Sequence, residues 1–141
     1  MRETLIGIGL AVTLFAAPAD AVEPTHTKKF TACMDLAGGV TADMRDCIAA
    51  ETERWDVRLN KAYKAILPVL TKRTTVGDTN VKKTFVEAQR AWLKYRKANC
   101  TYYISRTGGT IDLVNGASCW LDETARRTVE LEDVLEMERS Q

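Results

Sequence analysis

Residues 88–100 have the sequence AQRAWLKYRKANC, and this stretch decides the fold. Large side chains in and around it recur at three- and four-residue steps, which return to one side of a helix with 3.6 residues per turn. These positions are Phe85, Ala88, Trp92, Tyr95, Asn99 and Tyr103. Gln89 and Arg96 lie close in angle to this apolar side, and the helix runs directly into Cys100. We therefore expect a packed helix that buries polar groups as well as apolar ones.

The N-terminal residues of the chain predict an exported protein. Residues 1–21 combine a weakly positive start, a short apolar run and small residues at the end, which is the pattern of a cleaved signal peptide. The run is shorter than the roughly 20 apolar residues that span a bilayer, so we expect no stable membrane insertion. The formal net charge of the 141 residues is +1, which gives no reason to expect nucleic acid as a partner. We expect cleavage near Ala21 and a periplasmic or secreted product.

The rest of the chain is expected to form a polar leader and one domain. Residues 22–40 are polar and end in Gly38-Gly39, so we predict an extended or weakly ordered leader in which His26 is solvated. Residues 41–141 are predicted to be a single helical domain of ordinary size.

Three helices are expected in this domain. The first starts at Thr41, which can cap it, and ends or kinks at Pro68. The second extends from about Asn80 to Ser105, and the third begins near Ser118, after a turn-rich loop. No strand pattern occurs, so the sequence predicts an all-α fold: a long antiparallel helical hairpin that is covered by a third, C-terminal helix and stapled by disulfides at one end.

Antiparallel pairing of the first two helices makes a contact prediction. It sets Glu51 opposite Arg96 and Trp55 opposite Trp92. We expect a buried or half-buried ion pair there, and two solvated charges are the alternative. The polar side chains assigned to an internal network are Glu51, Asn60, Gln89, Arg96 and Thr124.

The cysteines are predicted to form two disulfides. An even number in an exported chain favours disulfides over thiol chemistry or zinc, and no CxxC motif accompanies the single histidine, His26. We favour Cys33 with Cys47 and Cys100 with Cys119, each closing a short loop, and Cys47 with Cys100 is the main rival. No metal or other cofactor is expected.

The sequence offers little support for catalysis. Acid–base chemistry usually needs a histidine or paired carboxylates in a cleft, whereas the acidic residues here are spread along helix surfaces. Gly108-Gly109 lacks both the lysine and the preceding strand of a phosphate-binding loop. We therefore expect a binding protein and not an enzyme.

Several motifs resemble one known family. They are Cys33, Met44 and Cys47; Leu59-Asn60 with Tyr63; Ala88 to Trp92 with Arg96 and Cys100; Gly108-Gly109-Thr110; and Cys119 with Thr124, Arg127 and Leu131. With these residues the chain resembles the LprI-type family of exported lysozyme inhibitors, small helical domains with four cysteines. Thr110 stands where that pattern more often has serine. The lipoprotein cysteine of some members is missing, which implies a soluble form.

The resemblance implies an envelope protein that binds and inhibits lysozyme or a related peptidoglycan-cleaving enzyme. As a hypothesis, a disulfide-tied loop enters the substrate groove of that enzyme; a simple turn is the alternative. The residues of this predicted inhibitory loop are Thr107, Gly108, Gly109, Thr110, Asp112 and Asn115. The rival function is a non-inhibitory periplasmic interaction module, or an immunity protein for a cell-wall-targeting toxin.

Overall fold

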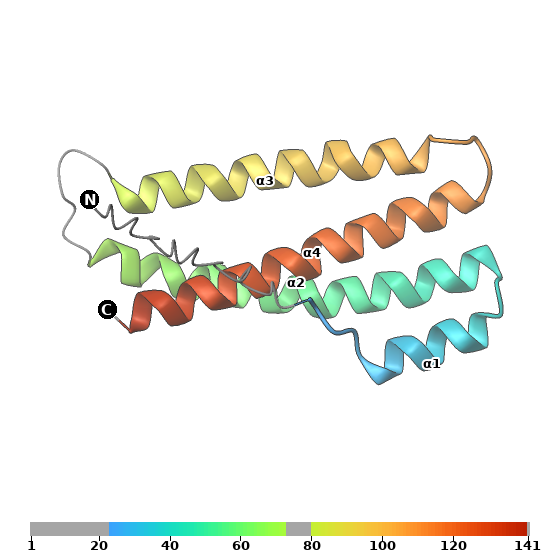
Figure 1. Cartoon of the computed structure of the whole chain (residues 1–141), viewed down its shortest axis with the longest axis horizontal. Coiled ribbons are helices and arrows are strands. Elements are labelled where there is room, and N and C mark those ends of the chain that lie inside the picture. Colours follow the sequence, from blue (N-terminus) through green and yellow to red (C-terminus); the bar gives the residue numbers. More distant parts are fainter. Residues whose placement is uncertain (1–22, 73–79, 141) are drawn as a thin grey trace, which may run out of the picture.

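The computed structural model describes residues 23–72 and 80–140, and within these ranges all regular structure is α-helical (Figure 1). The helices are α1 (Lys28–Ala37), α2 (Thr41–Thr71), α3 (Val81–Ile104) and α4 (Ile111–Arg139). The all-α class is confirmed. The predicted signal peptide, residues 1–21, lies outside the described residues and stays a prediction.

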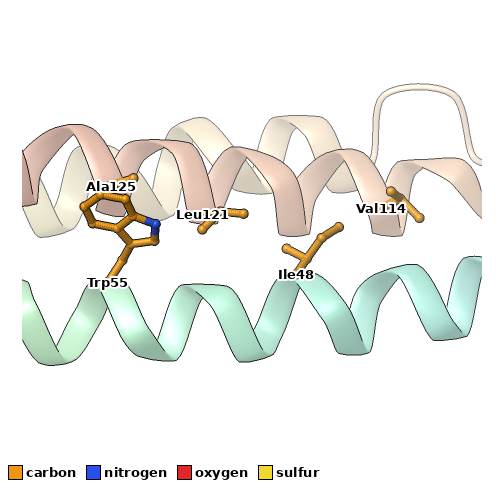
Figure 2. Close-up of a cluster of buried hydrophobic side chains, with 5 residues drawn as sticks. All are labelled: Ile48, Trp55, Val114, Leu121 and Ala125. Atoms are coloured by element: carbon orange, nitrogen blue, oxygen red, sulfur yellow. The ribbon is translucent and has the colours of Figure 1, made fainter. Parts of the chain in front are cut away.

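The core lies mainly between α2 and α4. In Figure 1, α4 lies between α2 and α3 near the α3–α4 loop and crosses α2 toward its own C-terminal end. Figure 2 shows Ile48 and Trp55 of α2 directed toward Val114, Leu121 and Ala125 of α4, and these five side chains form one buried cluster. A second cluster continues the same interface, with Leu59, Ala62, Ile66 and Leu70 of α2 and Leu131 of α4. Burial of one large apolar side chain contributes about 1.5–3 kcal/mol, so this interface dominates the stability of the bundle.

The helix pairing therefore differs from the predicted hairpin. Helix α2 contacts α4 extensively and α3 only slightly, although α2 and α3 are consecutive and antiparallel. The buried residues of α3 are Gln89, Arg96 and Cys100, none of which has a large aliphatic side chain. Because α2 has its apolar stripe matched by α4, α3 occupies the outside of the bundle and packs chiefly on α4.

The predicted polar leader contains a helix, α1, which corrects the expectation of weak order there. The side chain of Thr27 accepts a hydrogen bond from Phe30 N (3.1 Å) and caps the helix. Phe30 and Met34, four residues apart, then pack against the cluster around Trp55. Gly38, with φ 55°, ends the helix in the left-handed conformation that suits glycine. The sequence did not predict α1, because Phe30 and Met34 are only two apolar residues among many polar ones.

Helix α4 begins at Ile111 and not near Ser118, so Asn115 and Gly116 are helical and do not form a turn. Gly116 is buried, and a Cβ there would overlap Cγ1 of Ile104 and lie 3.1 Å from its Cδ1. Glycine at this position therefore lets α3 and α4 approach closely. Helix α2 also differs in detail, because it continues past Pro68 to Thr71.

Candidate functional site

Two disulfides tie the helices together near one end of the bundle. Cys33 of α1 is bonded to Cys47 of α2, and Cys100 of α3 is bonded to Cys119 of α4. This is the favoured short-loop pairing, and the rival bond between Cys47 and Cys100 is wrong. The α1–α2 turn and the α3–α4 loop lie at the same end of the molecule (Figure 1). We call residues 36–40 and 102–113 together the stapled end.

The α3–α4 loop is held from inside by Asp112. This carboxylate is fully buried and accepts hydrogen bonds from Thr107 N (2.6 Å), Thr107 Oγ1 (2.9 Å) and Gly108 N (2.8 Å). The hydrogen bond from the backbone N–H of Thr107 is the main cause that holds the pKa of Asp112 below its usual range. Burial alone would raise this pKa. Further lowering comes from the hydroxyl of Thr107, the N–H of Gly108 and the charge of Arg106. Gly108 has a φ of 77°, which favours glycine.

The predicted inhibitory loop is consequently shorter than expected. Its exposed part is residues 105–110, where Thr107 to Thr110 face solvent. Asp112 closes the loop and is not available to a partner, because its oxygens are occupied by the loop backbone. Asn115 is half-buried on α4. The helix start at Ile111 is the physical reason for both corrections.

Exposed apolar side chains gather at the stapled end. Six of the ten exposed large apolar residues in the described ranges lie there: Leu36, Val40, Tyr102, Ile104, Ile111 and Leu113. Leu36 is 88% exposed and Ile111 is 50% exposed. Exposed apolar groups that are concentrated on one part of a surface mark interaction sites, whereas isolated ones need no explanation. The sequence alone did not single out these residues, although large apolar side chains next to Gly38-Gly39 and Gly108-Gly109 could have indicated exposed apolar groups at turns.

Arg96 of α3 lies between Trp92 of α3 and Trp120 of α4, and it does not pair with Glu51. Its guanidinium carbon is 4.5 Å from the ring centres of both Trp92 and Trp120, and Nη1 donates a hydrogen bond to Thr124 Oγ1 (2.8 Å). Burial lowers the pKa of Arg96, and the charges of Asp56 and Glu123 oppose that effect. Within the described residues, Nε of Arg96 is buried without a hydrogen-bond partner.

A second polar contact also joins α3 to α4. Gln89 is buried and accepts a hydrogen bond from Arg127 Nε (2.9 Å). Arg127 in turn donates to Glu130 (2.8 Å) and lies 6.0 Å from the ring centre of Trp92. Hydrogen bonds and cation–π contacts therefore supplement the apolar contacts that attach α3 to the core.

Glu51 anchors the segment before α1. It is fully buried and accepts hydrogen bonds from Thr27 N and Oγ1 (both 2.8 Å) and from Arg54 Nε (2.7 Å). Burial raises the pKa of Glu51, but these hydrogen bonds and the charge of Arg54 outweigh it, so the pKa lies below its ordinary value. The predicted ion pair between Glu51 and Arg96 is therefore wrong.

His26 is packed and not simply solvated. Its Nδ1 accepts a hydrogen bond from Trp55 Nε1 (3.2 Å) and lies 3.7 Å from Glu51 Oε1. Its Nε2 lies 3.7 Å from Asp122 Oδ1 on α4. Trp55 consequently faces this segment and α4, whereas Trp92 packs against the second cluster, so the predicted pairing of these two tryptophans fails.

The predicted polar network divides into separate groups. The structure joins Arg96 to Thr124, as that network requires. Gln89 has Arg127 as its partner, and Asn60 donates to its own helix, at Asp56 O (2.8 Å) and Oδ2 (3.0 Å). Within residues 23–72 and 80–140, no group of three His, Cys, Asp or Glu is placed to hold a metal ion, and no helix is long and apolar enough to cross a membrane.

Comparisons with known proteins identify the family. The family model described as "Lysozyme inhibitor LprI" matches residues 33–131. The chain therefore belongs to the LprI lysozyme inhibitor family, as the resemblance predicted. It is also similar to an uncharacterized protein of Rhizobium meliloti (strain 1021), with 30% identity over 128 residues, or 85% of this chain and 86% of that protein. No solved structure matches the chain.

Proposed function

We propose that this protein is exported, is released near Ala21, and inhibits lysozyme or a related peptidoglycan-cleaving enzyme by binding to it. Membership of the LprI family supports this function. Export is supported by the two disulfides, which persist in oxidising compartments such as the periplasm, and by the signal-like residues 1–21. Inhibition by occupation of a partner's groove needs no catalytic group in the inhibitor.

The stapled end is the surface that we assign to the partner. The observation that carries this assignment is the gathering of exposed apolar side chains on the two turns that the disulfides flank. Interfaces draw most of their binding energy from a few such side chains. Because the helices at both turns are cross-linked and Asp112 fixes the loop, little conformational entropy is lost on binding.

The narrow α3–α4 loop fits this role as the part that enters a groove. Thr107, Gly108, Gly109 and Thr110 present hydroxyl and backbone groups with little side-chain bulk. Such groups can take the hydrogen bonds that a sugar would otherwise make. Ile111 and Leu113, directly after the loop, then add apolar contact at its base.

The experiment measures the clearing of a cell-wall suspension by lysozyme in the presence of purified residues 22–141. We expect slower clearing at micromolar inhibitor. Leu36→Ser and Ile111→Ser should each weaken inhibition about tenfold, which corresponds to about 1.4 kcal/mol. Val57→Ser is the matched control, because Val57 is 65% exposed on α2 but lies outside the stapled end.

Unchanged clearing at micromolar excess would contradict the inhibitor function. Capture of another envelope protein through the same surface, without effect on lysozyme, would favour the rival function of an interaction module or toxin immunity protein. Equal losses from Val57→Ser and Leu36→Ser would contradict the assignment of the stapled end while leaving inhibition itself intact.

A further inference from the structure

A polar cleft lies between the C-terminal part of α3 and the N-terminal half of α4. Its volume is about 450 Å³, within the range of about 300–1,000 Å³ that is usual for ligand pockets. Cys119 lines it, and the disulfide from Cys119 to Cys100 joins its two walls. Arg106, from the α3–α4 loop, also lines it. The cleft is thus built on cross-linked helices, which keep its shape fixed.

Glu123 is the centre of the polar groups in this cleft. Its Oε1 accepts hydrogen bonds from Asn99 Nδ2 (3.2 Å) and from the hydroxyl of Tyr95 (3.4 Å), and it lies 3.6 Å from Nη1 of Arg126. The negative charge of Glu123 is the main cause that raises the pKa of Tyr95 above its ordinary value. Donors and acceptors are therefore held in place before any ligand arrives.

The charges of the lining balance one another. Arg106 and Arg126 supply two cations, while Asp122 and Glu123 supply two carboxylates. This balance gives no net attraction to a ligand of either charge, and an apolar ligand would leave the polar groups without hydrogen bonds. The lining therefore suits a neutral ligand with many hydroxyl groups.

Two tyrosine rings complete the chemistry. Tyr95 and Tyr103 line the cleft on α3, about two helical turns apart, and Tyr95 is 53% exposed. An aromatic ring offers a flat apolar face together with a polar edge. A pyranose ring has a matching character, because its C–H groups form an apolar face and its hydroxyl groups form a polar rim that can both donate and accept.

We propose that this cleft binds a neutral oligosaccharide, with a sugar ring against Tyr95 and its hydroxyl groups bonded to Asn99, Glu123 and Arg126. The exposed apolar side chains assigned to the partner enzyme do not line this cleft, whereas Tyr103 and Arg106 belong both to its lining and to the stapled end. A sugar bound at Tyr95, Asn99, Glu123 and Arg126 would leave the exposed apolar side chains of the stapled end free. The inference does not depend on lysozyme inhibition.

The test is an NMR titration of ¹⁵N-labelled residues 22–141 with tri-N-acetylchitotriose and, separately, with cellotriose. No lysozyme is present. We expect amide shifts confined to the cleft, with half-saturation on the order of 1 mM for at least one of the two sugars. Tyr95→Ala and Glu123→Gln should each weaken that binding about tenfold or more. A preference for the acetylated sugar would identify amino sugars as the ligand, and equal binding would indicate hexose rings in general.

Tyr102→Ala is the matched control, since Tyr102 is an exposed tyrosine of α3 that does not line the cleft. Tyr102→Ala should leave sugar binding unchanged and weaken lysozyme inhibition. Tyr95→Ala should weaken sugar binding and leave lysozyme inhibition unchanged. Circular dichroism of each variant verifies that the helices are intact. No shifts with either sugar at about 10 mM, or equal affinity in Tyr95→Ala and Glu123→Gln, would overturn the proposal and leave the inhibitor function untouched.

Discussion

Replacement of Gly116 by alanine should reveal how closely α3 and α4 approach at the stapled end. The added Cβ would overlap Cγ1 of Ile104 and lie 3.1 Å from Cδ1. Inserting a methyl group into such a contact costs about 1–3 kcal/mol. Alanine in place of glycine inside a helix stabilises the fold by about 1 kcal/mol through its higher helix propensity. We therefore expect Gly116→Ala to lower the free energy of unfolding by about 0–2 kcal/mol.

Removal of the Ile104 side chain should change the sign of this effect. In an Ile104→Ala background the space is vacant, so Gly116→Ala should raise the free energy of unfolding by about 1 kcal/mol through helix propensity alone. Urea unfolding of the wild type, both single variants and the double variant gives the coupling energy between the two positions. We expect a coupling of about 1–3 kcal/mol.

A coupling below about 0.5 kcal/mol would refute this reasoning, because distant positions are additive within that limit. It would mean that Ile104 does not pack on Gly116 and that α4 does not extend through position 116 as described. Gly109→Ala combined with Ile104→Ala is the control cycle. A Cβ at position 109 would make only ordinary contacts, 3.5 Å from Thr107 Oγ1 and 3.9 Å from Ile111 Cγ2, so its coupling to Ile104 should be negligible.

Three further predictions concern the elements that fix the stapled end and α1. Gly108→Ala should lower the free energy of unfolding by about 1–2 kcal/mol and weaken inhibition, because the φ of 77° at Gly108 disfavours a side chain. Gly109→Ala should change neither urea unfolding nor the clearing assay appreciably. Equal effects of the two variants would contradict the prediction. Glu51→Gln should lower the free energy of unfolding by about 1–3 kcal/mol at pH 7, because the charge-assisted hydrogen bonds of the Glu51 carboxylate are lost. Because the folded pKa of Glu51 is lowered from 4.5, its charge stabilises the fold at neutral pH, and this contribution is lost as pH falls through the folded pKa. Urea unfolding across that range should show the wild type and the variant converging, and a constant difference would count against this role. Joint replacement of Cys100 and Cys119 by serine should cost about 3 kcal/mol in urea unfolding, and no loss of stability would contradict a structural role for that bond.

The sequence predicts α3 and the favoured disulfide pairing well for a physical reason. Helical periodicity is a local property, so the apolar steps around Trp92 predict α3 to within a residue or so of its ends. The order of elements brings all four cysteines to one end, and the short loops favour the pairing that the structure has, although the sequence left Cys47 with Cys100 open as a rival. Family membership agrees with the same motifs.

The choice of helix partner and the polar contacts could not be predicted in the same way. The stripe of α2 shows that it packs, but not whether α3 or α4 covers it. The predicted hairpin placed Glu51 opposite Arg96. The observed position of Arg96 between Trp92 and Trp120 depends on the packing of α4 against α3, which the local sequence pattern does not show. Asn115-Gly116 has the composition of a turn, and only the contact with Ile104 explains why that glycine is helical.

The central claim is that a rigid, cross-linked helical bundle binds lysozyme through its stapled end. Hydrogen–deuterium exchange of residues 22–141, with and without saturating lysozyme, tests this claim most directly. We predict slower exchange in the complex at residues 36–40 and 105–113, with unchanged exchange in the C-terminal turns of α4. Slower exchange confined to residues 130–139, or no difference along the chain at saturation, would contradict it.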